Sequence, residues 1–100
     1  MARRGTFTVD AESVQGNAGA TITFRQLKVR EVRAIRDGEA DDEDVLTTHI
    51  AAWSGILDDD GNELPSPQDE PGILGELYVQ EQTTIIQLLF AGPDGASAKN

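Results

Sequence analysis

Two short segments near the N-terminus alternate apolar residues with threonine, and this alternation most constrains the fold. Residues 5–9 read Gly-Thr-Phe-Thr-Val, and residues 20–24 read Ala-Thr-Ile-Thr-Phe. A period of two is typical of a strand that buries one face. The segment between them, residues 15–19, is rich in turn-forming glycine and asparagine. We therefore predict an antiparallel strand pair with a long or irregular connection.

After Phe24 the apolar residues follow a helical period. A first helix is predicted to carry Leu27, Val29, Val32 and Ile35 and to end at Asp37-Gly38. The acidic segment 39–44 then supplies an N-cap at Asp41 or Asp42, with carboxylates in the first turn. A second, amphipathic helix is predicted over residues 45–57, where the apolar residues have spacings of four, three and four: Leu46, Ile50, Trp53 and Leu57.

The C-terminal half contains prolines that interrupt any continuous helix. Pro65 and Pro67 exclude a helix through that segment, and either Pro67 or Pro71 suits the first turn of the next one. A last helix runs from Val79 to Phe90 and ends at Gly92-Pro93. The predicted fold class is α+β: an N-terminal antiparallel β-strand pair followed by three or four short helices. Residues 1–92 form the single domain, and residues 93–100 form a flexible polar tail.

Composition limits both the core and the partners. The chain has 100 residues, of which 38% are apolar, and a formal net charge of −10. A core that thin favours oligomerisation. The negative charge disfavours nucleic acid and anionic membranes as partners, and no apolar run approaches the roughly 20 residues that span a bilayer. The basic N-terminus is followed by polar residues, so no signal peptide is expected, and the expected location is the cytoplasm.

No residue pattern indicates catalysis or a bound cofactor. The chain has no cysteine and one histidine, His49, which lies on the predicted amphipathic helix and lacks an adjacent nucleophile. The acidic turn at residues 58–62 fails as an EF-hand, because aligning Gly61 puts Ile56 and Pro67 at the two terminal ligand positions. No glycine-rich phosphate loop is present. We expect no enzyme activity, no cofactor and no metal.

Basic residues are concentrated in one short segment. Residues 25–36 contain five of the eight basic residues and one acid, Glu31, so this segment is positive in a strongly acidic chain. These five are a candidate charged docking surface: Arg25, Lys28, Arg30, Arg33 and Arg36. The segment can complement the acidic helix start at residues 41–44, mediate self-association, or bind an acidic partner. We favour the first two. Nucleic-acid binding ranks third, because no aromatic residues interleave with the basic ones and the net charge repels nucleic acid.

Several short motifs recur in a known family. They are Phe24-Arg25-Gln26-Leu27 with Glu31, His49-Ile50-Ala51-Ala52-Trp53, the run from Asp58 to Pro65, the step Pro67, Asp69 and Pro71, and Leu77 with the apolar helix at 85–90. In these motifs the chain resembles the tail assembly chaperones of long-tailed bacteriophages. The resemblance covers about two thirds of the chain.

The resemblance implies a function. Such chaperones are non-enzymatic, bind the hydrophobic, helical tape measure protein in the host cytoplasm, keep it soluble during tail assembly, and are absent from the mature virion. An apolar groove between helices suits such a client. We expect the predicted helices at 45–57 and 79–90 to form its walls, with these contact residues: Ile50, Trp53, Leu57, Ile86 and Phe90.

Two other functions remain open. The chain could be a structural virion protein of the tail or the head–tail junction, with its strands joining a sheet shared between subunits. It could instead be an acidic adaptor or antitoxin-like protein that binds a basic partner. In each reading the partner is a protein, either the tape measure protein, another viral tail protein or a second copy.

Overall fold

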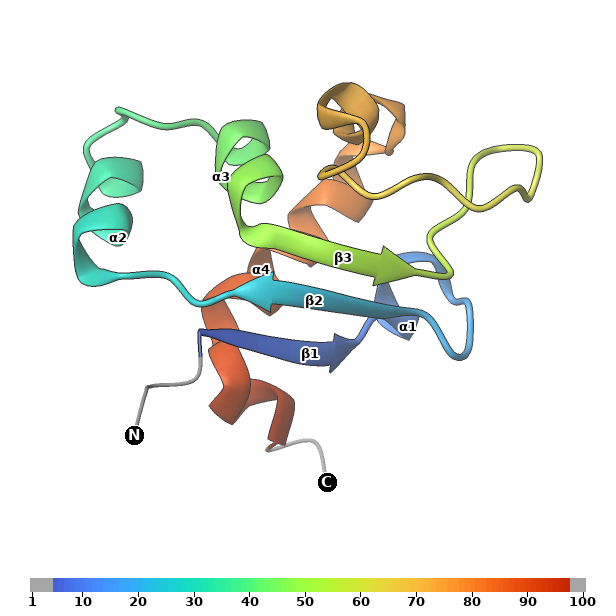
Figure 1. The fold of residues 1–100 in the computed structure, drawn as a ribbon, viewed down its shortest axis with the longest axis horizontal. Helices are drawn as coiled ribbons and strands as arrows, with labels where there is room; N and C mark the ends of the chain where they lie inside the picture. Colours follow the sequence, from blue (N-terminus) through green and yellow to red (C-terminus); the bar gives the residue numbers. More distant parts are fainter. Residues whose placement is uncertain (1–4, 98–100) are drawn as a thin grey trace.

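The computed structural model describes residues 5–97, and the α+β class is confirmed. Three strands and several helices alternate along the chain (Figure 1). In chain order they are β1 (Thr6–Asp10), α1 (Glu12–Gln15), β2 (Thr21–Arg25), α2 (Val29–Arg36), α3 (Asp42–His49), β3 (Ile50–Ser54), the 3-10 helix η1 (Pro71–Glu76) and α4 (Val79–Ser97).

The predicted N-terminal strand pair is confirmed. Strands β1 and β2 pair antiparallel, with Phe7 opposite Phe24 and Thr8 opposite Thr23. The two phenylalanine rings, whose centroids are 5.5 Å apart, lie on the buried face of the sheet. The two threonine hydroxyls lie on the other face and are hydrogen-bonded at 2.8 Å. The alternation in sequence thus corresponds to one buried and one open face.

The predicted helix over residues 45–57 is wrong. Helix α3 ends at His49, and the next residues form a third strand, β3, antiparallel to β2. Phe24 pairs with Ile50 while Thr23 pairs with Ala52, so Ala51 is the extra residue of a β-bulge. The bulge lets Ile50 and Trp53, three residues apart, both face the core, although strand neighbours of the same face are normally two apart. A strand with a bulge therefore produced the spacing of a helix.

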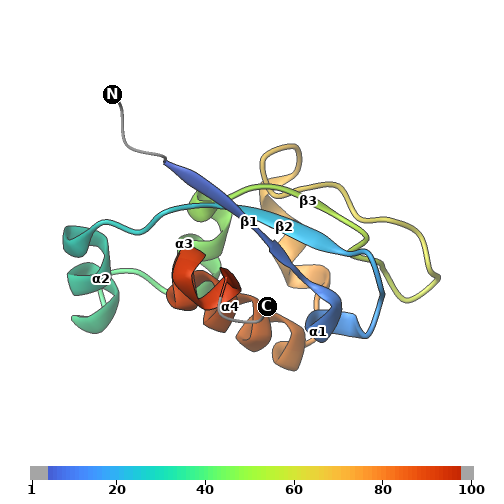
Figure 2. The ribbon, with the colours of Figure 1, turned by 90° about the horizontal axis from the view of Figure 1, so that it is seen from below.

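Helices cover only one face of the sheet. The sheet order is β1-β2-β3, and α4, α1 and α3 lie on the same side of it (Figure 2). Helix α4 contacts both α1 and β1. The core between these layers includes buried side chains from all three strands and three helices: Val9, Ile22, Phe24, Leu46, Ile50, Trp53, Leu74, Ile85 and Leu89. The opposite face of the sheet carries threonine, serine and alanine, with Asp10 and Arg25 at the strand ends.

Helix ends follow the expected local signals. At the end of α2 the backbone N–H of Asp37 donates to the Arg33 carbonyl. Asp41 caps α3 by accepting a hydrogen bond from the Asp44 N–H at 2.8 Å. Residues 71–91 form two helices, η1 and the first part of α4. Gly92, with φ of 69°, interrupts α4 where its end was predicted, and the backbone is helical again up to Ser97. Residues 98–100 of the predicted flexible tail lie outside the described residues.

A hairpin-like loop returns the chain from β3. Leu57 bridges Glu63, and the Asp58 carboxylate accepts hydrogen bonds from the backbone N–H groups of Asp60 and Asn62, both at 2.9 Å. The Trp53 indole N–H donates to the Leu64 carbonyl at 3.0 Å. The acidic run at 58–62 is therefore a self-capped turn, which the buried tryptophan fastens to the sheet.

The connection between β1 and β2 fastens the other side of this loop. The Gln15 side-chain amide donates to the Leu57 carbonyl at 2.8 Å and accepts from the Leu57 N–H at 2.9 Å. Asn17 donates to the Gly55 carbonyl at 2.8 Å. Segments about 40 residues apart in sequence thus satisfy each other's polar groups.

Gly55 offers a test of the close approach between the loop after β3 and the connection between β1 and β2. Its φ is 79°, and an added Cβ would lie 3.0 Å from the Ala20 Cα. Gly61 has a similar φ of 86° but open space around it. Gly61→Ala should cost about 1–2 kcal/mol from the left-handed conformation alone. Gly55→Ala should cost at least about 1 kcal/mol more, because backbone must move. Urea unfolding of both variants measures the difference, and equal costs would contradict the contact.

Candidate functional site

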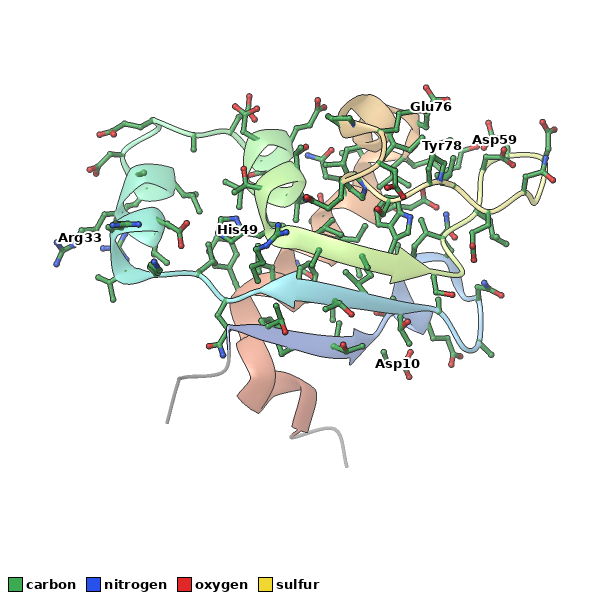
Figure 3. All side chains as sticks on the ribbon, in the orientation of Figure 1. Asp10, Arg33, His49, Asp59, Glu76 and Tyr78 are labelled. Atoms are coloured by element: carbon green, nitrogen blue, oxygen red, sulfur yellow. The ribbon has the colours of Figure 1, made fainter. Side chains whose placement is uncertain are left out.

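The predicted basic docking residues surround the start of α2. Arg25 ends β2, Lys28 immediately precedes α2, and the remaining three lie on α2 itself: Arg30, Arg33 and Arg36. All five side chains are exposed. Figure 3 shows Arg33 directed outward from α2, away from the sheet. The sequence cluster is therefore a surface cluster in the folded chain.

The predicted charge complement between this cluster and the start of α3 is not made through ion pairs. Among the described side chains, the one ion pair within 4.0 Å joins Glu31 and His49. None of the five basic residues pairs with the acidic residues at 41–44 in the described part of the chain. The charged side chains of Arg30, Arg33 and Arg36 lie exposed on α2.

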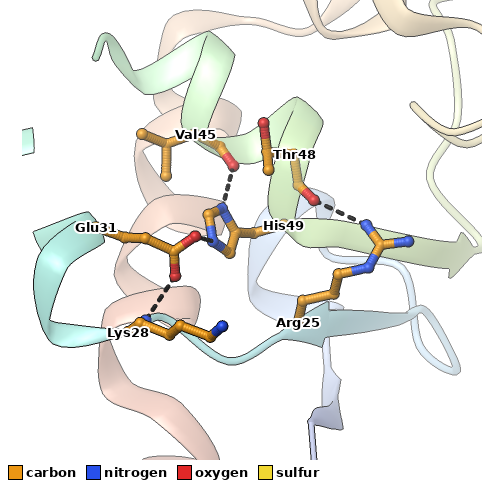
Figure 4. Close-up of polar contacts among 6 residues, drawn as sticks. All are labelled: Arg25, Lys28, Glu31, Val45, Thr48 and His49. Atoms are coloured by element: carbon orange, nitrogen blue, oxygen red, sulfur yellow. Dashed lines mark hydrogen bonds and ion pairs between the residues drawn. The ribbon is translucent and has the colours of Figure 1, made fainter. Parts of the chain in front are cut away.

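His49 connects α2 to the end of α3. Its ring is buried, with Nδ1 2.9 Å from the Val45 carbonyl and Nε2 3.2 Å from the Glu31 carboxylate (Figure 4). Both neighbours are acceptors, so both contacts are hydrogen bonds only when both ring nitrogens carry hydrogen. His49 is therefore a buried link between two helices.

Glu31 serves two partners at once. Its other carboxylate oxygen accepts a hydrogen bond from the Lys28 backbone N–H at 2.6 Å. This bond, together with the nearby His49, holds the pKa of Glu31 below its ordinary value of 4.5 although partial burial acts in the opposite direction. Glu31 is therefore an anion that both caps α2 and joins it to α3.

An open cleft lies beside this network. It has a volume of about 1090 Å³, and its lining includes Lys28, Glu31 and His49 together with Leu27 and Val29. Arg25 and Lys28 give it a positive rim, and the Arg25 guanidinium donates to the Thr48 carbonyl at 2.8 Å. The cleft combines positive charge with exposed apolar surface, which suits an acidic segment of another protein.

The predicted apolar contact residues are not one surface. Ile50, Trp53 and Ile86 are buried in the core, and Leu57 is half-buried in the loop after β3. Phe90 is 48% exposed on α4. Because no helix spans residues 45–57, the expected groove between that helix and the helix at 79–90 is not formed. In this conformation Phe90 is the predicted contact residue that a partner can reach most readily.

Two exposed apolar residues, Val79 and Phe90, lie near the two ends of one side of α4, with the buried Ile86 and the exposed Thr83 between them. We call this side the α4 stripe. Of the two, only Phe90 was predicted from the sequence. Val79 is 83% exposed, and it lies eleven residues before Phe90. Eleven residues are close to three full helical turns, so both side chains lie on the same side of α4, about 16 Å apart along its axis. The sequence signal for Val79 is its spacing of eleven residues from Phe90. That spacing puts Val79 on a different side of α4 from the buried Ile85 and Leu89.

The accessible side of α4 also lacks charge. From Val79 to Gly92 the one charged residue is Glu81, which is half-buried and accepts a hydrogen bond from the Tyr78 N–H at 2.8 Å. The other exposed positions are glutamine, threonine and alanine. In a chain of net charge −10, an uncharged stretch with large exposed apolar groups is typical of a protein–protein contact.

Tyr78 ties the start of this stripe to the loop after β3. Its hydroxyl donates to the Asp59 carboxylate at 2.6 Å, and Figure 3 shows the two residues on neighbouring segments. The Asp59 carboxylate raises the pKa of Tyr78, because losing the phenolic proton would lose the bond and place two negative charges together. The loop and α4 are thereby held in a fixed relation.

The described residues contain no cluster of three or more histidine, cysteine or acidic side chains that could hold a metal ion. No described helix has the length and apolarity needed to cross a membrane.

The Glu31–His49 pair predicts a pH-dependent stability difference. Glu31→Gln keeps the shape and an acceptor for Lys28 N–H but removes the charge, so it should destabilise the fold by about 1 kcal/mol at neutral pH. Because the pKa of Glu31 is lowered on folding, this contribution is complete above pH 4.5 and disappears as the pH falls below that value. Chemical unfolding of both proteins from pH 3 to 7 measures it.

The control is Glu31→Ala, which also removes the cap on α2 and should cost more than Glu31→Gln at every pH. A difference between wild type and Glu31→Gln that does not change with pH would show that the charge is not the stabilising feature.

In comparisons with known proteins, no family model matches this chain, and no curated protein or solved structure matches it.

Proposed function

We propose that this chain is a non-enzymatic binding protein that holds an apolar helical segment of a partner against α4. The observation that carries the proposal is the uncharged stripe on α4, where Val79 and Phe90 are 83% and 48% exposed on the same side of the helix. A partner that contacts both side chains would cover an uncharged surface of an otherwise acidic chain.

The partner chemistry follows from this geometry. A second amphipathic helix could lie along the stripe, with its own apolar residues between Val79 and Phe90. The glutamine and threonine side chains beside the stripe can form hydrogen bonds without charge repulsion. The remaining acidic surface would keep the complex in solution.

The resemblance to phage tail assembly chaperones supports a specific client, the tape measure protein. Such a client is long, helical and apolar, which suits the stripe. In this structure the tryptophan and the aspartate-glycine turn of the shared motifs build the loop after β3 through Trp53 and Asp58. We therefore assign client contact to α4 and assign those two motifs to the scaffold. The complex would form in the host cytoplasm, and the protein would be absent from the mature virion.

Two substitutions on α4 test the proposal. Val79→Asp and Phe90→Asp should each weaken client binding about tenfold or more, because each removes an apolar contact and introduces a buried charge. The matched control is Val29→Asp, since Val29 is 70% exposed but lies on α2. The measurement is the amount of a co-expressed tape measure fragment that stays soluble and co-elutes with each variant.

Two results would count against the proposal. One is a fragment that stays insoluble with the wild-type protein, and the other is a Val29→Asp variant that fails as badly as the two α4 variants. Mass spectrometry of purified particles provides a second check, because a protein present in many copies would be a structural subunit.

A further inference from the structure

The outer edge of β1 is unpaired in the described part of the chain. Strand β1 is first in the sheet order and pairs with β2 alone. The backbone bonds that flank the pair run from Gln26 N–H to the Gly5 carbonyl at 2.9 Å and from Ala11 N–H to the Ala20 carbonyl at 2.8 Å. Antiparallel hydrogen bonding alternates along a strand, so odd-numbered residues of β1 face β2. The N–H and C=O groups of Thr6, Thr8 and Asp10 therefore point outward.

The opposite edge of the sheet is covered. The Gln68 side-chain amide donates to the Ile50 carbonyl at 3.1 Å, and Trp53 donates to the Leu64 carbonyl at 3.0 Å. The segment after the loop thus lies along β3 and shields it. The two edges of the sheet differ, and β1 is the one that offers backbone groups to another strand.

Residues 6–9 of strand β1 lack the features that usually protect an edge, and the one charged residue of the strand is Asp10 at its C-terminal end. Proteins block free edges with charged side chains, prolines or bulges. Residues 6–9, Thr-Phe-Thr-Val, contain neither charge nor proline, and the pairing of β1 has no register shift. These residue types also have high strand propensity. In a chain of net charge −10, the uncharged residues 6–9 leave most of this edge suited to pairing.

We propose that β1 pairs antiparallel with β1 of a second copy, with the two Thr8 residues opposite each other. In this register the outward residues of both strands coincide, since Thr6 faces the partner's Asp10, and about six backbone hydrogen bonds can form. The result is a continuous six-stranded sheet with a two-fold axis at Thr8.

Side chains match in the same register. On the buried side, Phe7 meets the partner's Val9, so the apolar faces of the two sheets become continuous. On the open side, Arg25 lies in the same row as Thr6, so the positive end of one sheet adjoins the Asp10 end of the other. This complementarity favours a second copy over an unrelated strand. The test of this pairing uses the protein alone, so its outcome does not depend on any client.

Cysteine cross-linking tests the register directly, because the natural chain has no cysteine. Residues opposite each other in a hydrogen-bonded pair have Cα atoms about 5.5 Å apart, within the range that a disulfide bridges. Thr8→Cys should therefore give a disulfide-linked dimer on mild oxidation. Thr6→Cys, exposed on the same strand, should not, since its symmetry mate lies about four residues away along the strand.

The pattern of cross-links decides the question. Dimer from Thr8→Cys alone supports the proposal. Dimer from neither variant, or from both to the same extent, overturns it.

Thr8→Pro supplies a second measurement without any cross-linker. Proline removes the outward N–H of Thr8 but no bond to β2. Sedimentation should give twice the chain mass of 10.8 kDa for wild type and 10.8 kDa for the variant, with circular dichroism confirming that the variant is folded. A monomeric wild type at concentrations where Thr8→Cys fails to cross-link would refute self-pairing.

Discussion

The pairing of β3 with β2 is the interaction on which the rest of the structure depends. It places Ile50 and Trp53 in the core through the bulge at Ala51. The tryptophan then holds the Leu64 carbonyl, which fixes the loop after β3 and leads the chain toward η1. At its other end β3 follows His49 directly, so the same strand sets where α3 and its link to Glu31 lie. Without β3, neither the loop nor the α2 contact would have a fixed position.

Much of the fold could be predicted from local patterns. The threonine alternation predicted β1 and β2, Asp41 predicted the start of α3, and Gly92 predicted the break in α4, because each feature acts over a few residues. Strand β3 could not be predicted this way. Its residue spacing matches a helix, and what makes it a strand is the distant edge of β2. Pairing across that distance overrides local propensity.

The candidate site was predicted less well than the fold. The basic cluster was found because charge in a short segment is visible in sequence, but its lack of ion partners among the described residues depends on geometry. Which apolar residues are exposed likewise depends on geometry that the sequence does not show. Ile50 and Phe90 look alike in a helical pattern, yet one is fully buried and the other is 48% exposed. Which apolar residues remain accessible is decided by the side on which the sheet lies, and Val79 was missed for that reason.

The amides of Gln15 and Asn17 have a consequence for how the protein is made. They bind the backbone of residues 55–57, which leave the ribosome long after the first hairpin can form. During that interval the hairpin of β1 and β2 exposes both of its edges. The side-chain amides of Gln15 and Asn17 then lack the backbone carbonyls of Leu57 and Gly55 that they bind in the folded protein. Closure of the sheet therefore waits on a long-range step, which slows folding relative to a helical chain of this size. A nascent chain that meets a second one before residue 57 emerges has two edges open to it, whereas the finished protein has one.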